Sequence, residues 1–141
     1  MVHALEKSRS LLSPQGTVLN IHDLPRPPRI EIHAQDGETF AGFLLSHTNF
    51  ENQRLADQAL AQVVEDGLFM SAEAHLFNYQ IYTDTLETLE ELLTESWETA
   101  YLPDDTMARI SDLLSSAGDD AEIVLRMTAR LSMLRPVVEV G

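Results

Sequence analysis

The fold is decided by residues 122–134, which read Glu-Ile-Val-Leu-Arg-Met-Thr-Ala-Arg-Leu-Ser-Met-Leu. Every second residue of this stretch is apolar: Ile123, Leu125, Met127, Ala129, Leu131 and Met133. The positions between them include Arg126, Thr128 and Arg130. Because successive side chains of a strand point to opposite faces, this period of two predicts a long, half-buried strand over residues 121–134.

Four shorter segments also have strand character. They are residues 17–22, 29–33, 39–45 and 74–83. The first of them, Thr-Val-Leu-Asn-Ile-His, is mostly apolar and is followed by a proline cluster at 25–28, so we expect a strand that is buried on both faces. Asp36-Gly37 is a turn signal between the second and third segments and predicts a hairpin.

Helical spacing of apolar residues marks four further segments. They are residues 3–12, 51–66, 85–98 and 103–116. We expect Asp84 to cap the third helix, because Glu87 follows three positions later as in a capping box. Pro103 suits the first turn of the fourth helix.

Length and element order together predict the architecture. A chain of 141 residues and 15.8 kDa is the size of one domain. We therefore predict a single α+β domain over 1–141, with a helix–turn–strand segment at 1–24, a proline-rich connection at 25–28 and the remainder at 29–141. Its mixed, largely antiparallel sheet would have about four to five strands packed against three to four helices.

Composition excludes several classes of function. Nine Lys and Arg residues stand against 23 Asp and Glu residues, a net charge of −14 that disfavours nucleic acid and anionic membranes as partners. The acidic stretch between Arg54 and Arg109 serves either solubility or a basic protein partner. The chain has no cysteine, no apolar run long enough for a bilayer, and no signal-peptide core after Met1, so we expect a cytoplasmic protein.

Few residues suggest chemistry. The glycines do not have the spacing of a phosphate-binding or dinucleotide-binding loop. We assign no catalytic, cofactor-binding or metal residue, and we expect no cofactor. His22 beside Asp23 is a candidate base or metal ligand near a strand end, against a packing role. His33 and His47, in the two arms of the hairpin, are a candidate metal pair that needs a third ligand, against a surface role.

A small-molecule pocket is the alternative site. We expect it between the sheet and the helices, and its candidate residues are His22, Tyr79, Trp97 and Arg126. The competing interpretation is that the aromatic residues fill the core and that the arginine pairs with one of the many acids.

Residues 10–22, Ser-Leu-Leu-Ser-Pro-Gln-Gly-Thr-Val-Leu-Asn-Ile-His, support a family resemblance. They resemble the helix, Pro-Gly-Gly turn and fifth strand of class I S-adenosylmethionine-dependent methyltransferases, with Gln15 in place of the first glycine. The predicted strands at 75–83 and 121–134 and the two late helices resemble the rear part of that fold. The chain thus resembles the C-terminal half of such an enzyme, without the glycine-rich loop and the acid that hold the cofactor.

The resemblance also implies a function, because the chain would lack the half of the enzyme that binds the cofactor and that pairs with strand 17–22. Strand 17–22 would have lost its neighbour, so we expect a homodimer through the 17–22 edge or the sheet face. The leading hypothesis is a non-enzymatic, self-associating accessory or interaction domain that binds no S-adenosylmethionine alone. Two alternatives stay open: a small-molecule-binding or catalytic domain, and one half of a two-chain methyltransferase.

Overall fold

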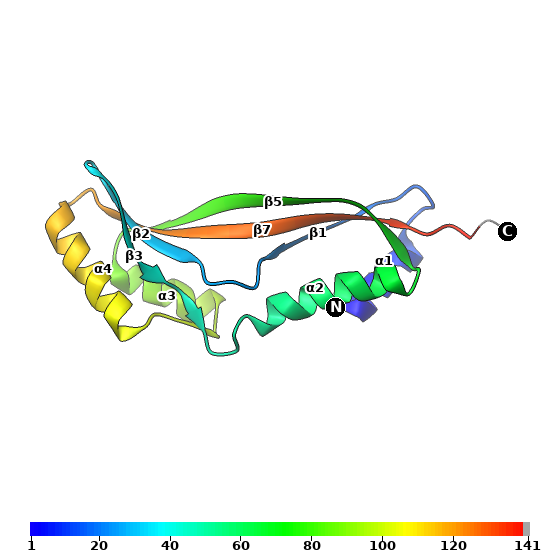
Figure 1. The fold of residues 1–141 in the computed structure, drawn as a ribbon, viewed down its shortest axis with the longest axis horizontal. Coiled ribbons are helices and arrows are strands. Elements are labelled where there is room, and N and C mark those ends of the chain that lie inside the picture. The colour runs from blue at the N-terminus through cyan, green and yellow to red at the C-terminus, as the bar shows by residue number, and fades with distance from the viewer. Residues whose placement is uncertain (140–141) are drawn as a thin grey trace. The chain divides into compact units, whose positions relative to one another are not determined.

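The computed structural model describes residues 1–139 (Figure 1). Within them lie four helices, a five-stranded, mostly antiparallel sheet and a small two-stranded sheet. The predicted α+β class is therefore confirmed. Internal contacts divide the chain into two compact units. Unit 1 comprises Met1–Pro25, Glu51–Phe77 and the described residues from Ala129 onward, and unit 2 comprises Arg26–Phe50 and Asn78–Thr128.

Unit 1 packs two helices against three strands. Its elements are α1 (Val2–Leu11), β1 (Val18–Asp23), α2 (Glu51–Glu65), the first part of β5 (Phe69–Thr83) and the last part of β7 (Glu122–Pro136). β1 runs antiparallel to β7, from Val18 opposite Leu134 to Asp23 opposite Ala129. The buried core is formed by Leu5, Leu60, Val63, Phe69 and Leu134.

The strand predicted at 17–22 is confirmed as β1, but the expectation that both of its faces are buried is wrong. Leu19 and Ile21 are 60% and 62% exposed. The helices of unit 1 cover only the face that carries Val18, Asn20 and His22. An apolar sequence therefore forms a strand with one open apolar face.

Unit 2 has the larger core. Its elements are β2 (Arg29–Ala34), β3 (Gly37–Phe43), β4 (Leu45–Ser46), α3 (Leu86–Ser96), β6 (Ala100–Tyr101), α4 (Asp104–Ala117) and the remaining parts of β5 and β7. β2 and β3 form the predicted hairpin, and β2 also pairs with β7. Ile123, Leu125 and Met127 of β7 join a core that includes Leu89 and Ile110 of the two helices.

Two local expectations are corrected. The strand predicted at 74–83 begins five residues earlier, at Phe69, because pairing with β7 outweighs the helix preference of Ala72, Glu73 and Ala74. The helix cap predicted at Asp84 is instead Thr85, whose hydroxyl accepts from the backbone N–H of Thr88 at 3.1 Å.

Candidate functional site

His22 lies in unit 1 and is held at both ring nitrogens. The amide of Asn20 donates to Nδ1 at 2.8 Å, which leaves Nε2–H to donate to Asp57 Oδ1 at 2.6 Å. Arg130 Nη1 donates to the same carboxylate oxygen at 3.0 Å. Both nitrogens are thus used in a polar link between the strands and α2. The carboxylate that contacts His22 lies 35 positions away in sequence, so spacing gave no signal for it.

Arg126 lies in unit 2 within an ion-pair network. Its Nε donates to Glu31 Oε1 at 2.6 Å, and its Nη2 donates to Glu38 Oε2 at 2.8 Å. Arg29 Nε and His33 Nε2 also donate to Glu31, at 2.8 and 3.0 Å. Burial raises the pKa of Glu31, which is 6% exposed, but these three donors outweigh burial and hold the pKa at about 2.

The same network contains the ligand types of a metal site. Atoms of Glu31, His33 and Glu38 lie within 4.8 Å of one another. However, the guanidinium of Arg126 bridges the two carboxylates, and Arg29 neutralises the second oxygen of Glu31. A metal ion would have to displace Arg126, so the cluster is best explained as a structural network. The other candidate histidine, His47, stacks on Tyr101 with ring centroids 4.1 Å apart.

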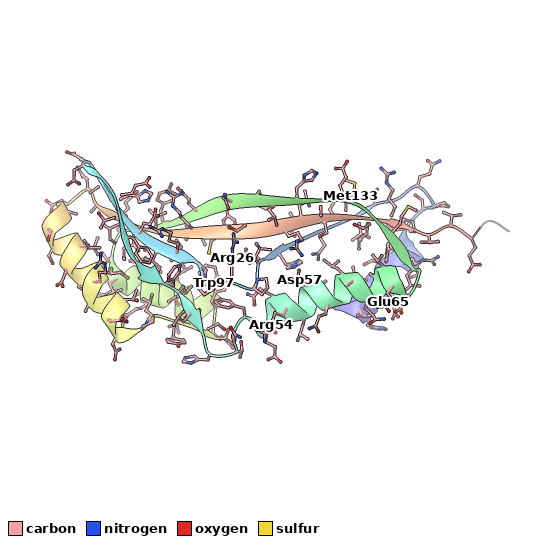
Figure 2. All side chains as sticks on the ribbon, in the orientation of Figure 1. Arg26, Arg54, Asp57, Glu65, Trp97 and Met133 are labelled. Carbon is pink, nitrogen blue, oxygen red and sulfur yellow. The ribbon has the colours of Figure 1, made fainter. Side chains whose placement is uncertain are left out.

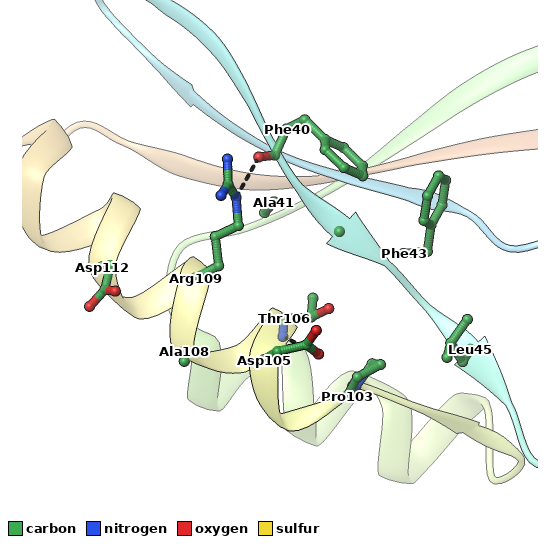
Figure 3. A pocket seen from close by; sticks show the side chains of 11 residues that line it. Phe40, Ala41, Phe43, Leu45, Pro103, Asp105, Thr106, Ala108, Arg109 and Asp112 are labelled. Atoms are coloured by element: carbon green, nitrogen blue, oxygen red, sulfur yellow. Dashed lines mark hydrogen bonds between the residues drawn. The ribbon is translucent and has the colours of Figure 1, made fainter.

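The remaining pocket candidates belong to the core of unit 2. Tyr79 and Trp97 are half-buried and pack against its apolar cluster. A shallow groove does run along β3 and α4, and its lining includes Phe43, Leu45 and Pro103. Arg109, which also lines it, donates from Nε to the Phe40 carbonyl at 3.0 Å (Figure 3). None of the four pocket candidates lines that groove.

The open sheet face of unit 1 is apolar. Leu19 is opposite Met133 and Ile21 is opposite Leu131, so the four side chains share one face of the β1–β7 pair. Figure 2 shows Met133 on the side of the strands away from Asp57 and Glu65 of α2. The period of two in the sequence predicted that alternate side chains share a face. It did not predict that no helix of unit 1 would cover this face.

β5 is the most exposed strand of unit 1. All eight residues from Met70 to Phe77 are exposed, and the large side chains of Met70 and Leu76 are 54% and 58% exposed. Within residues 1–139, β5 pairs with β7 and with no other strand. We name Met70–Phe77 together with Leu19, Ile21, Leu131 and Met133 the unit 1 strand surface.

Comparisons with known proteins add no identity. No protein-family model, curated protein or solved structure matches the chain. The resemblance to the C-terminal half of a class I methyltransferase therefore stays a prediction. Within residues 1–139 we find no helix with the length and hydropathy needed to cross a membrane.

Proposed function

We propose that the protein is a non-enzymatic, self-associating interaction domain whose unit 1 strand surface is covered by a second copy of the chain. The observation that carries the proposal is the exposure of every residue from Met70 to Phe77 in a strand with one strand neighbour. An exposed strand edge offers unpaired backbone groups to another chain, and contiguous exposed apolar side chains are typical of interaction sites.

The distribution of charge favours a second copy as the occupant. The unit 1 strand surface carries one formal charge, Glu73, although the whole chain has a net charge of −14. Acidic residues are concentrated instead on the two helices of unit 2, for example at Glu90, Glu91, Asp104 and Asp105. A basic partner would find few carboxylates on this surface, whereas two copies meet there with little local repulsion.

The candidate chemical groups support a role without catalysis. The imidazole of His22 and the guanidinium of Arg126 are both engaged by carboxylates of the chain itself. We therefore expect no heat of binding when S-adenosylmethionine is titrated calorimetrically into the protein alone. We also propose that the protein is located in the cytoplasm. Imaging of a tagged full chain tests this location.

Light scattering coupled to size-exclusion chromatography tests the self-association directly. A mass twice the 15.8 kDa of the chain is expected at micromolar concentration. Because the copies share a large negative charge, raising the salt concentration should shift the equilibrium toward the dimer. A mass of one chain at every concentration and salt level would contradict the proposal.

A further inference from the structure

β5 has the properties of an unprotected pairing edge. Proteins protect an exposed edge with Lys, Pro, a bulge or a covering element. Residues 69–83 contain no Lys, Arg, Pro or Gly, and Glu73 is their one formal charge. Nothing in this stretch prevents another strand from pairing with it.

The other two sheet edges differ from β5. At β3, Arg109 donates to the Phe40 carbonyl, and α4 approaches so closely that a Cβ on Gly42 would lie 2.6 Å from Thr106 Oγ1. The pairing of β2 with β3 also changes register between Ile30 and Glu31. β1 has only six residues and precedes the prolines of 25–28. β5 thus offers the longest regular edge.

We infer that β5 pairs antiparallel with β5 of a second copy, with Ala74 opposite the same residue of that copy. This inference rests on the self-association proposed above and names its seam. Two copies of one strand pair about a two-fold axis perpendicular to the sheet, which sets one residue opposite itself. The register of the paired strands is therefore set by which residue lies at the two-fold axis, opposite the same residue of the other copy.

The charge pattern of the strand selects Ala74. Glu73 and His75 lie on one face of β5, with His75 Nε2 3.1 Å from Glu73 Oε2. With Ala74 at the centre, each Glu73 faces a His75 of the other copy. A centre at Glu73 would oppose two carboxylates, and a centre at His75 would oppose two imidazoles.

The same register suits the neighbouring side chains. It sets Ala72 opposite Leu76 of the second copy, which pairs a small side chain with a large one on the other face of the strand. Pairing over residues 71–77 would form about six to eight backbone hydrogen bonds between the copies. The exposed backbone edge and the exposed Leu76 side chain both gain partners.

A cysteine at the centre of the seam tests the register, because the chain has no native cysteine. Opposed Cα atoms in an antiparallel pair lie about 4.5–5.5 Å apart, within the range of a disulfide. Ala74→Cys should form a disulfide-linked dimer on mild oxidation and keep the dimeric mass when reduced. Ser71→Cys is the matched control, since its two copies would lie about 20 Å apart and should not cross-link.

A charge exchange tests the same register without a covalent bond. Glu73→Lys should weaken the dimer about tenfold by sedimentation equilibrium, because it opposes two pairs of basic groups. The double variant Glu73→Lys with His75→Glu restores opposite charges across the seam and should recover most of the loss. Failure of the double variant to recover affinity would contradict the register.

The outcomes separate this inference from the proposed function. A dimer that does not cross-link through Ala74→Cys and dissociates on Ile21→Lys would overturn the β5 seam and leave self-association through the β1–β7 face. A chain that is monomeric without any substitution would overturn both. A disulfide-linked dimer of Ala74→Cys, with none from Ser71→Cys, is the result that the inference requires.

Discussion

The two units use the same strand, β7, in opposite ways. In unit 2, Ile123, Leu125 and Met127 lie in a core covered by α3 and α4. In unit 1, Leu131 and Met133 continue the same alternation of the sequence, but they share a face with Leu19 and Ile21, which are exposed. One apolar stripe therefore builds a core in one unit and an open face in the other.

This difference shows that period and hydropathy specify a strand but not what covers it. In unit 2, α3 follows β5 and α4 follows β6, and both helices bury apolar side chains of that unit. The helices of unit 1 instead contact the face of the β1–β7 pair that carries Val18 and Leu134, and not the face that carries Leu19 and Met133. The face that carries Leu19 and Ile21 stays exposed in unit 1, and we propose that it belongs to an interaction surface.

The largest expected effect comes from the same substitution placed in each unit. Leu125→Ala should lower the free energy of unfolding by about 2–5 kcal/mol, because Leu125 is 1% exposed and its loss leaves a cavity. Leu19→Ala, measured by urea unfolding at a concentration that keeps the chain monomeric, should cost less than about 0.5 kcal/mol. Equal losses of unfolding free energy in the two variants would contradict the difference between the covered face of unit 2 and the open face of unit 1.

The ion-pair network of unit 2 should make stability fall in acid. Glu31 has a pKa of about 2 in the folded chain against its ordinary value of 4.5. Its folded pKa is the lower one, so its contribution is present above pH 4.5 and is lost as the pH falls toward 2. We expect a loss of roughly 2–3 kcal/mol over that window in urea unfolding. Glu31→Gln should be less stable than the unsubstituted chain at pH 7, and its free energy of unfolding should fall less steeply between pH 4.5 and pH 2.

Close packing of β3 on α4 makes Gly42 sensitive to substitution. Gly42→Ala should cost about 1–3 kcal/mol, because φ is +151° and the added Cβ would meet Thr106 Oγ1 at 2.6 Å. Gly37→Ala is the matched control, since φ is +130° but no atom lies within 4 Å of its Cβ. Thermal unfolding should show the smaller loss at Gly37, and Thr106→Ala should recover part of the loss at Gly42.

The polar link of unit 1 should contribute least. Asp57 accepts from His22 and Arg130, but its side chain is more exposed than that of Glu31. Asp57→Asn should therefore cost about 0.5–1.5 kcal/mol in thermal unfolding. Glu65→Gln, an exposed change on the same helix, should have almost no effect. A loss at Asp57 as large as that at Glu31 would show that the two networks are equivalent.

Much of the fold could be predicted from local periodicity. The alternation over 121–134 and the apolar spacing over 103–116 depend on neighbours in sequence, and both elements are confirmed as β7 and α4. The first part of β5 could not be predicted in this way. Ala72, Glu73 and Ala74 have no alternating pattern and favour a helix, so their strand conformation depends on pairing with β7.

The candidate sites were harder to predict, because their partners are distant in sequence. The spacing of Arg29, Glu31 and His33 was a usable signal, since alternate residues of a strand share one face. Their contact with Arg126 required the pairing of β2 with β7, and the contact of His22 with Asp57 required the packing of α2. Tertiary structure, and not sequence spacing, assembled both networks.

Amide hydrogen exchange at two protein concentrations tests the central claim most directly. If a second copy completes unit 1 through β5, amides within Met70–Phe77 should become protected as concentration rises, while amides of β2 and β3 should exchange at the same rate throughout. Fast exchange of Met70–Phe77 at every concentration, in a sample whose mass is that of one chain, would contradict the account.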